Sequence, residues 1–333
     1  MEAVAARHQI LLPVGGTPIV ELALGVNGIK RILKLKLESY NPCGSLKDRI
    51  AITLVNSVAH RVNQDIGIIE STSGNLGVAM AAVCNERGIN FSAVVDPRTS
   101  PLLVERMRRL GARVKIIDEP DALGGYLLNR IRYVRSQLDA QPGLVWTNQY
   151  KSNANPRAHF ESTAPELWRQ LPGPATVLIP VSTGGTLAGF TRFARSRSLP
   201  WRLIGVDVTG SAALGTPAGE RLLSGIGASQ HSNFLDLGEV EAVHVTPADA
   251  ISACVWLSNS AAIDVGGSSG AAIAAALRVL RDDAEREELV CICPDGGDRY
   301  LTTIYQANWR EAHGVAGARV GDDVELLRVQ YIA

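Results

Sequence analysis

The sequence has no excess of either charge, no long hydrophobic run and few cysteines. Its 33 lysine and arginine residues balance 33 aspartate and glutamate residues, so it lacks the basic excess that binds the phosphate backbone of nucleic acids. No apolar run approaches the ~20 residues that span a bilayer as a helix. The five cysteines are scattered, with no CxxC pair, which argues against a disulfide framework or zinc site and fits a reducing cytoplasm. We therefore expect a cytoplasmic protein that acts on small molecules, without metal, nucleic acid or membrane.

What the sequence does contain is an alternation of short apolar runs with longer helical stretches. One series runs from residue 67 to residue 149 and a second begins at residue 175. This alternation is typical of βαβ units, in which a buried parallel sheet carries helices on both faces. The 333 residues also suggest about two domains. We expect an α/β fold with two lobes, each a mostly parallel sheet flanked by helices, and a cleft between them.

Three loops share one design, in which a buried strand ends, glycine and hydroxyl residues follow, and a helix begins. They are STSGNLG at 71–77, STGGT at 182–186 and GGSSG at 266–270. Free N–H groups at a helix start bind anions, although each loop by itself is equally typical of an ordinary N-cap. Their repetition favours anion binding. Neither a P-loop nor a GxGxxG fingerprint is present, which counts against a dinucleotide-dependent oxidoreductase of similar shape.

Lysine is scarce, with six residues against 27 arginines, so Lys47 in the segment NPCGSLKDR stands out. A lysine amine can form a Schiff base once its pKa is lowered, whereas an arginine cannot. Pro42 and Gly44 end a strand and Ser45 can cap a helix, which places Lys47 in the first helical turn. From the spacing alone, a solvated lysine at a helix start remains the simpler interpretation.

The motifs in combination resemble the fold-type II pyridoxal-phosphate enzymes, specifically the cysteine synthase and cystathionine β-synthase family. NPCGSLKDR, TSGN, NQY, NANP, TAPELW, STGGTLAG, GIGA, SSGAA and GDRYL occur in the family's order, between GGTPIVEL at residue 15 and the end of PDGGDRYL at residue 301. The resemblance implies a two-lobed homodimeric enzyme that uses pyridoxal 5'-phosphate. The smaller lobe, which would close over the substrate, is predicted at 45–151, and the larger at 1–44 plus 152–333.

The resemblance also implies a role for each motif. Lys47 would carry the cofactor and act as general base, Asn75 would bind the cofactor's phenolic oxygen, and Ser268 would face its pyridine nitrogen. The cofactor phosphate would lie on Ser182, Thr183, Gly184, Gly185 and Thr186, and the substrate carboxylate on Thr72, Ser73, Gly74 and Gln149. A hydroxyl opposite the ring nitrogen makes a weaker electron sink than a carboxylate would. The expected chemistry is therefore β-replacement through an α-aminoacrylate.

Several departures from ordinary cysteine synthases point to one branch of the family. Leu76 stands where threonine is usual, and VVDPRTSP, GGYLLNRIRYV and CPDGGDRY differ from the common pattern. They resemble the branch that makes N-(2-amino-2-carboxyethyl)-L-glutamate from O-phospho-L-serine and L-glutamate, towards 2,3-diaminopropionate in siderophore and antibiotic pathways. A dicarboxylate acceptor needs cationic contacts, for which Arg132 is the candidate, although a solvated helix arginine is an equal interpretation. Weaker candidates for the acceptor's approach are Ser229, Gln230 and His231.

The main alternative is a cysteine synthase that uses sulfide with O-acetylserine or O-phosphoserine. A serine or threonine dehydratase is more distant, cystathionine β-synthase fits less well, and a catalytically silent binding protein would not need Lys47, Asn75, STGGT and Ser268 together. We expect His159 to have a packing or surface role, because Lys47 already serves as base. Cys291 and Cys293 are predicted to be core residues rather than a redox pair.

Overall fold

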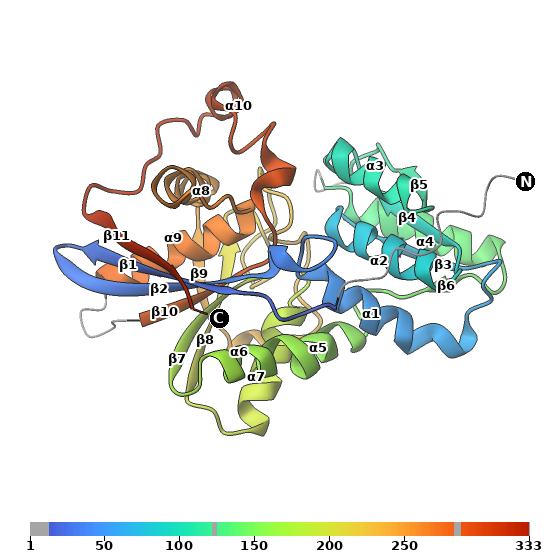
Figure 1. The fold of residues 1–333 in the computed structure, drawn as a ribbon. Helices are drawn as coiled ribbons and strands as arrows, with labels where there is room; N and C mark the ends of the chain where they lie inside the picture. Colours follow the sequence, from blue (N-terminus) through green and yellow to red (C-terminus); the bar gives the residue numbers. More distant parts are fainter. Residues whose placement is uncertain (1–12, 122–124, 283–287, 333) are drawn as a thin grey trace, which may run out of the picture.

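The computed structural model describes residues 13–121, 125–282 and 288–332. Residues 1–12, 283–287 and 333 of the predicted larger lobe, and residues 122–124 of the predicted smaller lobe, lie outside the described residues. Two separate sheets organise the chain, one of seven strands and one of four (Figure 1). Within the described ranges no helix has the length and apolarity to cross a membrane.

The smaller sheet is formed entirely by parallel strands in the order β5-β4-β3-β6. Its strands are β3 (Ile68–Ser71), β4 (Phe91–Val95), β5 (Arg113–Ile116) and β6 (Val145–Trp146). An apolar cluster joins one face to α1 (Lys47–Val58), α2 (Asn75–Glu86) and α3 (Pro101–Arg109). On the other face, Ile69 and Val94 pack against Val134 of α4 (Leu127–Ala140). These elements all fall within the range predicted for the smaller lobe, whose boundaries and movement stay predictions.

The larger sheet has the strand order β11-β1-β2-β10-β7-β8-β9 and is parallel from β2 to β9. Its parallel core comprises β2 (Ile29–Leu37), β7 (Ala175–Pro180), β8 (Trp201–Val208), β9 (Glu241–Val245) and β10 (Glu288–Cys293). The other edge is antiparallel, because β1 (Ile19–Val26) pairs with both β2 and β11 (Val324–Tyr331). The expectation of an α/β fold with mostly parallel sheets is confirmed; the antiparallel edge was not anticipated.

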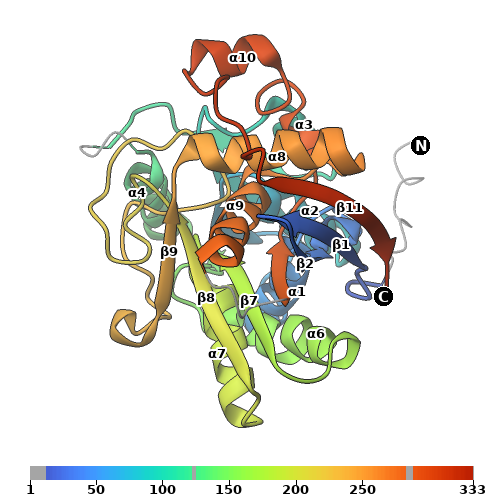
Figure 2. The same cartoon turned by 90° about the vertical axis from the view of Figure 1, so that its left-hand side faces the viewer.

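Helices cover both faces of the larger sheet, as Figure 2 shows. One apolar cluster joins it to α8 (Pro247–Ala261) and α9 (Gly267–Asp282), and another joins it to α6 (Ala164–Gln170) and α7 (Gly185–Ser196). Cys291 and Cys293 are buried in the first cluster, as expected for core residues; being two residues apart, they share one face of β10.

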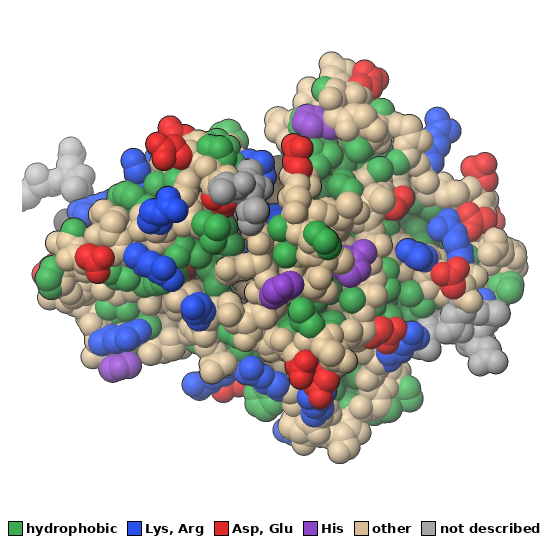
Figure 3. All heavy atoms as spheres, turned by 180° about the vertical axis from the view of Figure 1, so that it is seen from behind, with side chains coloured by type: hydrophobic (Ala, Val, Ile, Leu, Met, Phe, Trp, Pro, Cys, Tyr) green, Lys and Arg blue, Asp and Glu red, His purple; other side chains and the backbone are tan. Residues whose placement is uncertain are grey.

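Short elements complete the connections. They are η1 (Glu38–Tyr40), η2 (Ala59–Arg61), α5 (Ala154–Ala158), the π-helical turn η3 (His159–Thr163), η4 (Leu237–Glu239), η5 (Gly297–Tyr300) and α10 (Ala307–Ala312). On the face in Figure 3, side chains of both charges are interspersed rather than gathered by sign. This distribution agrees with the balanced composition.

Candidate active site

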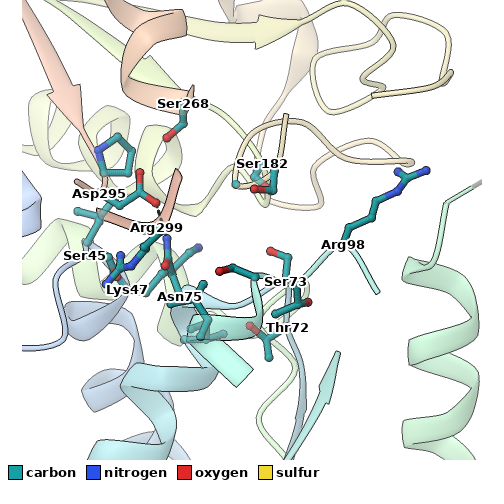
Figure 4. A pocket seen from close by; sticks show the side chains of 18 of the residues that line it. Ser45, Lys47, Thr72, Ser73, Asn75, Arg98, Ser182, Ser268, Asp295 and Arg299 are labelled. Carbon is teal, nitrogen blue, oxygen red and sulfur yellow. Dashed lines mark hydrogen bonds between the residues drawn. The ribbon is translucent and has the colours of Figure 1, made fainter. Parts of the chain in front are cut away.

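One cavity collects residues from both sheets at the points where helices begin. It has a volume of about 220 Å³, and we call it the inner pocket. The predicted site residues that line it are Lys47, Thr72, Ser73, Asn75, Gln149, Ser182, Thr183, Gly184, Thr186 and Ser268. Figure 4 shows several of them converging from separate segments. Because these residues span more than 200 positions of the sequence, the fold brings together what the chain keeps far apart.

Lys47 is the first residue of α1 and points into the inner pocket. The preceding turn is fixed by Asp48, whose carboxylate accepts a hydrogen bond from the Cys43 N–H at 2.6 Å. Burial lowers the pKa of Lys47 to about 8, although the carboxylates of Asp295 and Glu70 partly oppose that shift. A lysine with this pKa is a far better nucleophile and base near neutral pH than one at the usual 10.5. The simpler interpretation, a solvated lysine, is wrong.

The loop from Ser182 to Thr186 forms a glycine-containing cradle between β7 and α7. Gly184 has φ of +85°, and a Cβ added there would lie 2.0 Å from Ser232 Oγ, so only glycine fits. A hydrogen bond from Asn155 Nδ2 to Thr183 Oγ1, at 3.0 Å, fixes the position of the loop. Gly185, the one predicted residue of this loop that does not line the pocket, begins α7. The backbone N–H groups in the first turn of α7 have no carbonyl acceptor within the helix, so they are available to bind a phosphate.

His159 supports the same loop. It is fully buried, its Nδ1 lies 2.9 Å from Thr163 Oγ1, and its Nε2 lies 3.2 Å from Thr186 Oγ1. Burial lowers its pKa well below the usual 6.5, and the positive charges of Lys47 and Arg49 add to that effect. The imidazole is therefore neutral at physiological pH and holds Thr186 in place. Of the two roles expected for His159, packing and surface, the structure supports packing.

A second loop of the same design precedes α2. The Thr72 hydroxyl accepts hydrogen bonds from the N–H groups of Gly74 and Gly77, both at 3.1 Å. Gly74, with φ of +135°, is the N-cap of α2 and, unlike Thr72 and Ser73, is not among the residues that line the inner pocket. Leu76 lines the same pocket and is buried, so the position where threonine is usual is apolar in this chain.

Gln149 is joined to this loop through a buried carboxylate that the sequence did not single out. Glu70 accepts hydrogen bonds from Trp146 Nε1 at 3.0 Å, from Thr147 Oγ1 and from the Gln149 N–H at 3.2 Å. Gln149 in turn donates from Nε2 to Ser71 O at 2.7 Å. Burial raises the pKa of Glu70, against the opposing effect of these hydrogen bonds. Glu70 thus fixes the segment that carries Gln149 next to the loop that precedes α2.

Asp295 is a further site residue that sequence reasoning missed. It lines the inner pocket beside Ser268 (Figure 4) and accepts hydrogen bonds from Asn75 Nδ2 and Tyr300 OH, both at 2.7 Å. Burial raises its pKa. The available signal was its position at the start of PDGGDRYL, immediately after a buried strand, where side chains of parallel sheets face ligands.

Arg132 does not reach the site. It lies on the exposed face of α4, donates to Asn129 Oδ1 at 2.8 Å, and is absent from the pocket lining. Of the weaker candidates, Ser229 accepts a hydrogen bond from Arg221 at 3.1 Å and His231 lies 2.9 Å from Ala212 O. Neither these two nor Gln230 line the inner pocket.

The sequence is similar to known proteins of one enzyme family. Residues 10–295 match the family described as pyridoxal-phosphate dependent enzyme. The chain is 39% identical over 315 residues to N-(2-amino-2-carboxyethyl)-L-glutamate synthase of Ralstonia nicotianae, covering 93% of each protein. It is 38% identical over 309 residues to the protein of the same name from Cupriavidus metallidurans, covering 91% of each.

Solved structures agree on the fold. An O-acetylserine dependent cystathionine β-synthase from Helicobacter pylori is 29% identical, with a TM-score of 0.79 over 88% of this chain and 97% of that one. An O-ureido-L-serine synthase is 27% identical, with a TM-score of 0.77 over 87% of this chain and 92% of that one.

Proposed function

The chain belongs to the pyridoxal-phosphate dependent enzymes, with pyridoxal phosphate as its cofactor, and we propose that it is a transferase that joins an activated L-serine to the amine of L-glutamate. The donor is O-phospho-L-serine and the product is N-(2-amino-2-carboxyethyl)-L-glutamate. The Cβ–O bond of the donor breaks, a Cβ–N bond to glutamate forms, and phosphate leaves. The observation that carries this proposal is the 39% identity to a synthase of that name over 93% of both proteins.

The residues of the inner pocket fit the cofactor. Asn75 Oδ1 and Asp295 Oδ1 are buried and have no hydrogen-bond partner among the described residues, and such atoms call for a ligand or water. The cradle at Gly184 excludes any side chain at that position. Lys47 would hold the cofactor aldehyde, and the loop Ser182–Thr186 would bind its phosphate. Asn75 would contact the phenolic oxygen of the ring, and Ser268 would face the pyridine nitrogen.

The side chains of the inner pocket would have two tasks, namely proton transfer and orientation of the donor. When bound, the cofactor supplies an electron-withdrawing ring that allows an α-proton and a β-substituent to leave an amino acid. Lys47 Nζ, with a pKa near 8, can take that proton and return it. The hydroxyl and N–H groups at Thr72, Ser73 and Gly74 would orient the donor carboxylate.

The test of this proposal is to offer the purified holoenzyme each donor with each acceptor. We expect O-phospho-L-serine with L-glutamate to release phosphate and give the N-linked adduct, identified by mass spectrometry. O-acetyl-L-serine in place of O-phospho-L-serine tests the leaving group. If sulfide is consumed to give cysteine while glutamate gives no adduct with either donor, the chain is a cysteine synthase and the proposal is wrong.

We also propose that the protein is a homodimer that works in the cytoplasm. Strand β11 forms the edge of the larger sheet and exposes apolar side chains, among them Leu327, Val329 and Tyr331. Within the described residues no strand pairs with the outer edge of β11, and an edge that exposes apolar side chains is a surface suited to a partner chain. The five cysteines are unpaired, which fits a reducing compartment. Light scattering should give twice the chain mass, and a monomer mass at working concentrations would refute the dimer.

A further inference from the structure

A second, larger cavity opens from the inner pocket. It has a volume of about 680 Å³, and we call it the outer cavity. The two share Ser73, Arg98, Tyr150, Ser182, Ser224, Gly225, Tyr300 and Thr303 in their lining. The outer cavity therefore leads to Lys47 and is the space through which a second substrate would reach the donor carbon.

Three arginines line the outer cavity, namely Arg98, Arg130 and Arg221. Arg130 is buried, donates from Nη1 to Thr72 O, and has its Nε 3.4 Å from Asp96 Oδ2. The carboxylate of Asp96 balances its charge, and its hydrogen bond to Thr72 O holds the loop that precedes α2. The other acidic residue in the lining, Glu220, is exposed.

Arg98 enters from the smaller sheet, in the loop between β4 and α3. It belongs to VVDPRTSP, one of the segments in which this sequence departs from ordinary cysteine synthases. Its N–H donates to Asp96 Oδ1 at 3.0 Å, which fixes the turn, and its guanidinium lies 5.2 Å from the centre of the Tyr126 ring. Figure 4 shows its exposed side chain extending away from Thr72 and Ser73.

Arg221 comes from the larger lobe, in the segment after β8. It is half-buried, and its Nη2 donates to Ser229 Oγ at 3.1 Å. Burial lowers its pKa, and the positive charge of Arg98 lowers it further, while Asp207 and Asp121 oppose the shift. Two guanidinium groups that line one cavity are suited to bind an anion that carries two carboxylates.

We propose that Arg98 and Arg221 bind the carboxylates of the acceptor amino acid in the outer cavity. The assignment rests on the proposed function, since glutamate brings two carboxylates and sulfide brings none. Arginine suits this role because its planar fork pairs with a carboxylate through two hydrogen bonds. Because the two side chains come from different lobes, a dicarboxylate bound there would connect them. The donor's phosphate is the other anion that could use these arginines, and the experiment separates the two.

The test measures Arg98→Gln and Arg221→Gln holoenzymes with O-phospho-L-serine and L-glutamate. We expect the KM for glutamate to rise about tenfold or more in each variant, from lost charge-assisted hydrogen bonds, while the KM for the donor changes less than threefold. The preference for glutamate over glutamine should fall in at least one variant. Arg98→Lys, which keeps the charge and loses the fork, should fall between wild type and Arg98→Gln. The matched control is Arg108→Gln, an exposed arginine on α3 that lines neither cavity.

The possible results are distinct. If the donor KM rises and the glutamate KM does not, the arginines bind the phosphate and the acceptor assignment is wrong. An unchanged glutamate KM in both variants, in an enzyme that does form the glutamate adduct, overturns the assignment and leaves the proposed function intact. If wild type forms no glutamate adduct at all, the proposed function fails and the assignment fails with it.

Discussion

Lys47→Ala holoenzyme should lose turnover by about 10⁴-fold, the upper range for removal of a general base. The reason is structural, since Lys47 is the one lysine that lines the inner pocket as described, and the lowered pKa of its amine, about 8, results from that position. No other described lining residue is an amine that could both hold the cofactor and move a proton. The measurement is product formation from O-phospho-L-serine and L-glutamate under saturating cofactor.

A covalent readout separates loss of chemistry from loss of folding. Borohydride reduction of wild-type holoenzyme should fix the cofactor to Lys47, and the peptide that carries it can be identified by mass spectrometry. Lys47→Ala should retain the wild-type circular dichroism spectrum and take no label. The control is Lys151→Ala, at an exposed lysine just beyond the NQY motif, which should keep both label and turnover. Label on Lys151, or turnover within tenfold of wild type in Lys47→Ala, would contradict the assignment.

The strand, loop and helix units could be predicted because their signals are local. The loops expected at 71–77 and 182–186 do follow β3 and β7 and lead into α2 and α7. In both cases a run of apolar residues ends at glycine or hydroxyl residues within one short window. The site residues themselves were predicted from the resemblance to a known family, and ten of them line one cavity.

Arg132 was the predicted contact for the acceptor, but it does not line the site. The sequence of a helix does not determine which of its faces packs against the neighbouring elements. Successive residues of an α-helix are ~100° apart, so Arg130 and Arg132 point in nearly opposite directions. Arg130 faces the outer cavity and Arg132 faces solvent. The segment GGYLLNRIRYV contains both residues, and only the packing of α4 on the smaller sheet decides between them.

Contacts between distant segments were the other feature that could not be predicted. The antiparallel edge pairs Val20 with Tyr331, and no local pattern reports a partner 311 positions away. Asp295 meets Asn75 across 220 positions for the same reason. Arg98 and Arg221 approach one cavity from different sheets. The strand pairing depends on the order of strands within the larger sheet, and the other two depend on how the two lobes meet; the motifs alone leave both open.

A buried ionic cluster joins the helix that begins at Lys47 to the larger lobe. Arg49 donates to Glu38 at 2.7 and 2.9 Å and to Glu166 at 3.0 Å through both terminal nitrogens. Lys36 Nζ, which is fully buried, lies 2.5 Å from Glu166 Oε1. Glu38 is 0% exposed and Arg49 is 3% exposed. Each charge in the cluster is balanced by a direct partner.

Arg49→Met should therefore lower the free energy of unfolding by about 3–5 kcal/mol, the range for breaking a buried ion pair from one side. The substitution keeps much of the side-chain volume but leaves Glu38 and Glu166 buried with only Lys36 to balance them. Urea unfolding followed by circular dichroism is the measurement. The control is Arg157→Met, which removes an exposed i,i+4 pair with Glu161 and should change little.

The pH dependence of stability distinguishes a charge effect from lost packing. Burial alone would raise the pKa of Glu166, but hydrogen bonds and charge from Arg49, together with Lys36, lower it to about 2. Because the folded pKa lies below the usual 4.5, the stabilisation is fully present above about pH 4.5 and is lost as the pH falls towards 2. Without Arg49 the pKa of Glu166 should rise towards its usual value, so the acid-dependent loss should be smaller than in wild type and the difference in stability between the two proteins should narrow as the pH falls towards 2. A parallel decrease at every pH would instead attribute the destabilisation to packing, because packing energy does not depend on the protonation of Glu166.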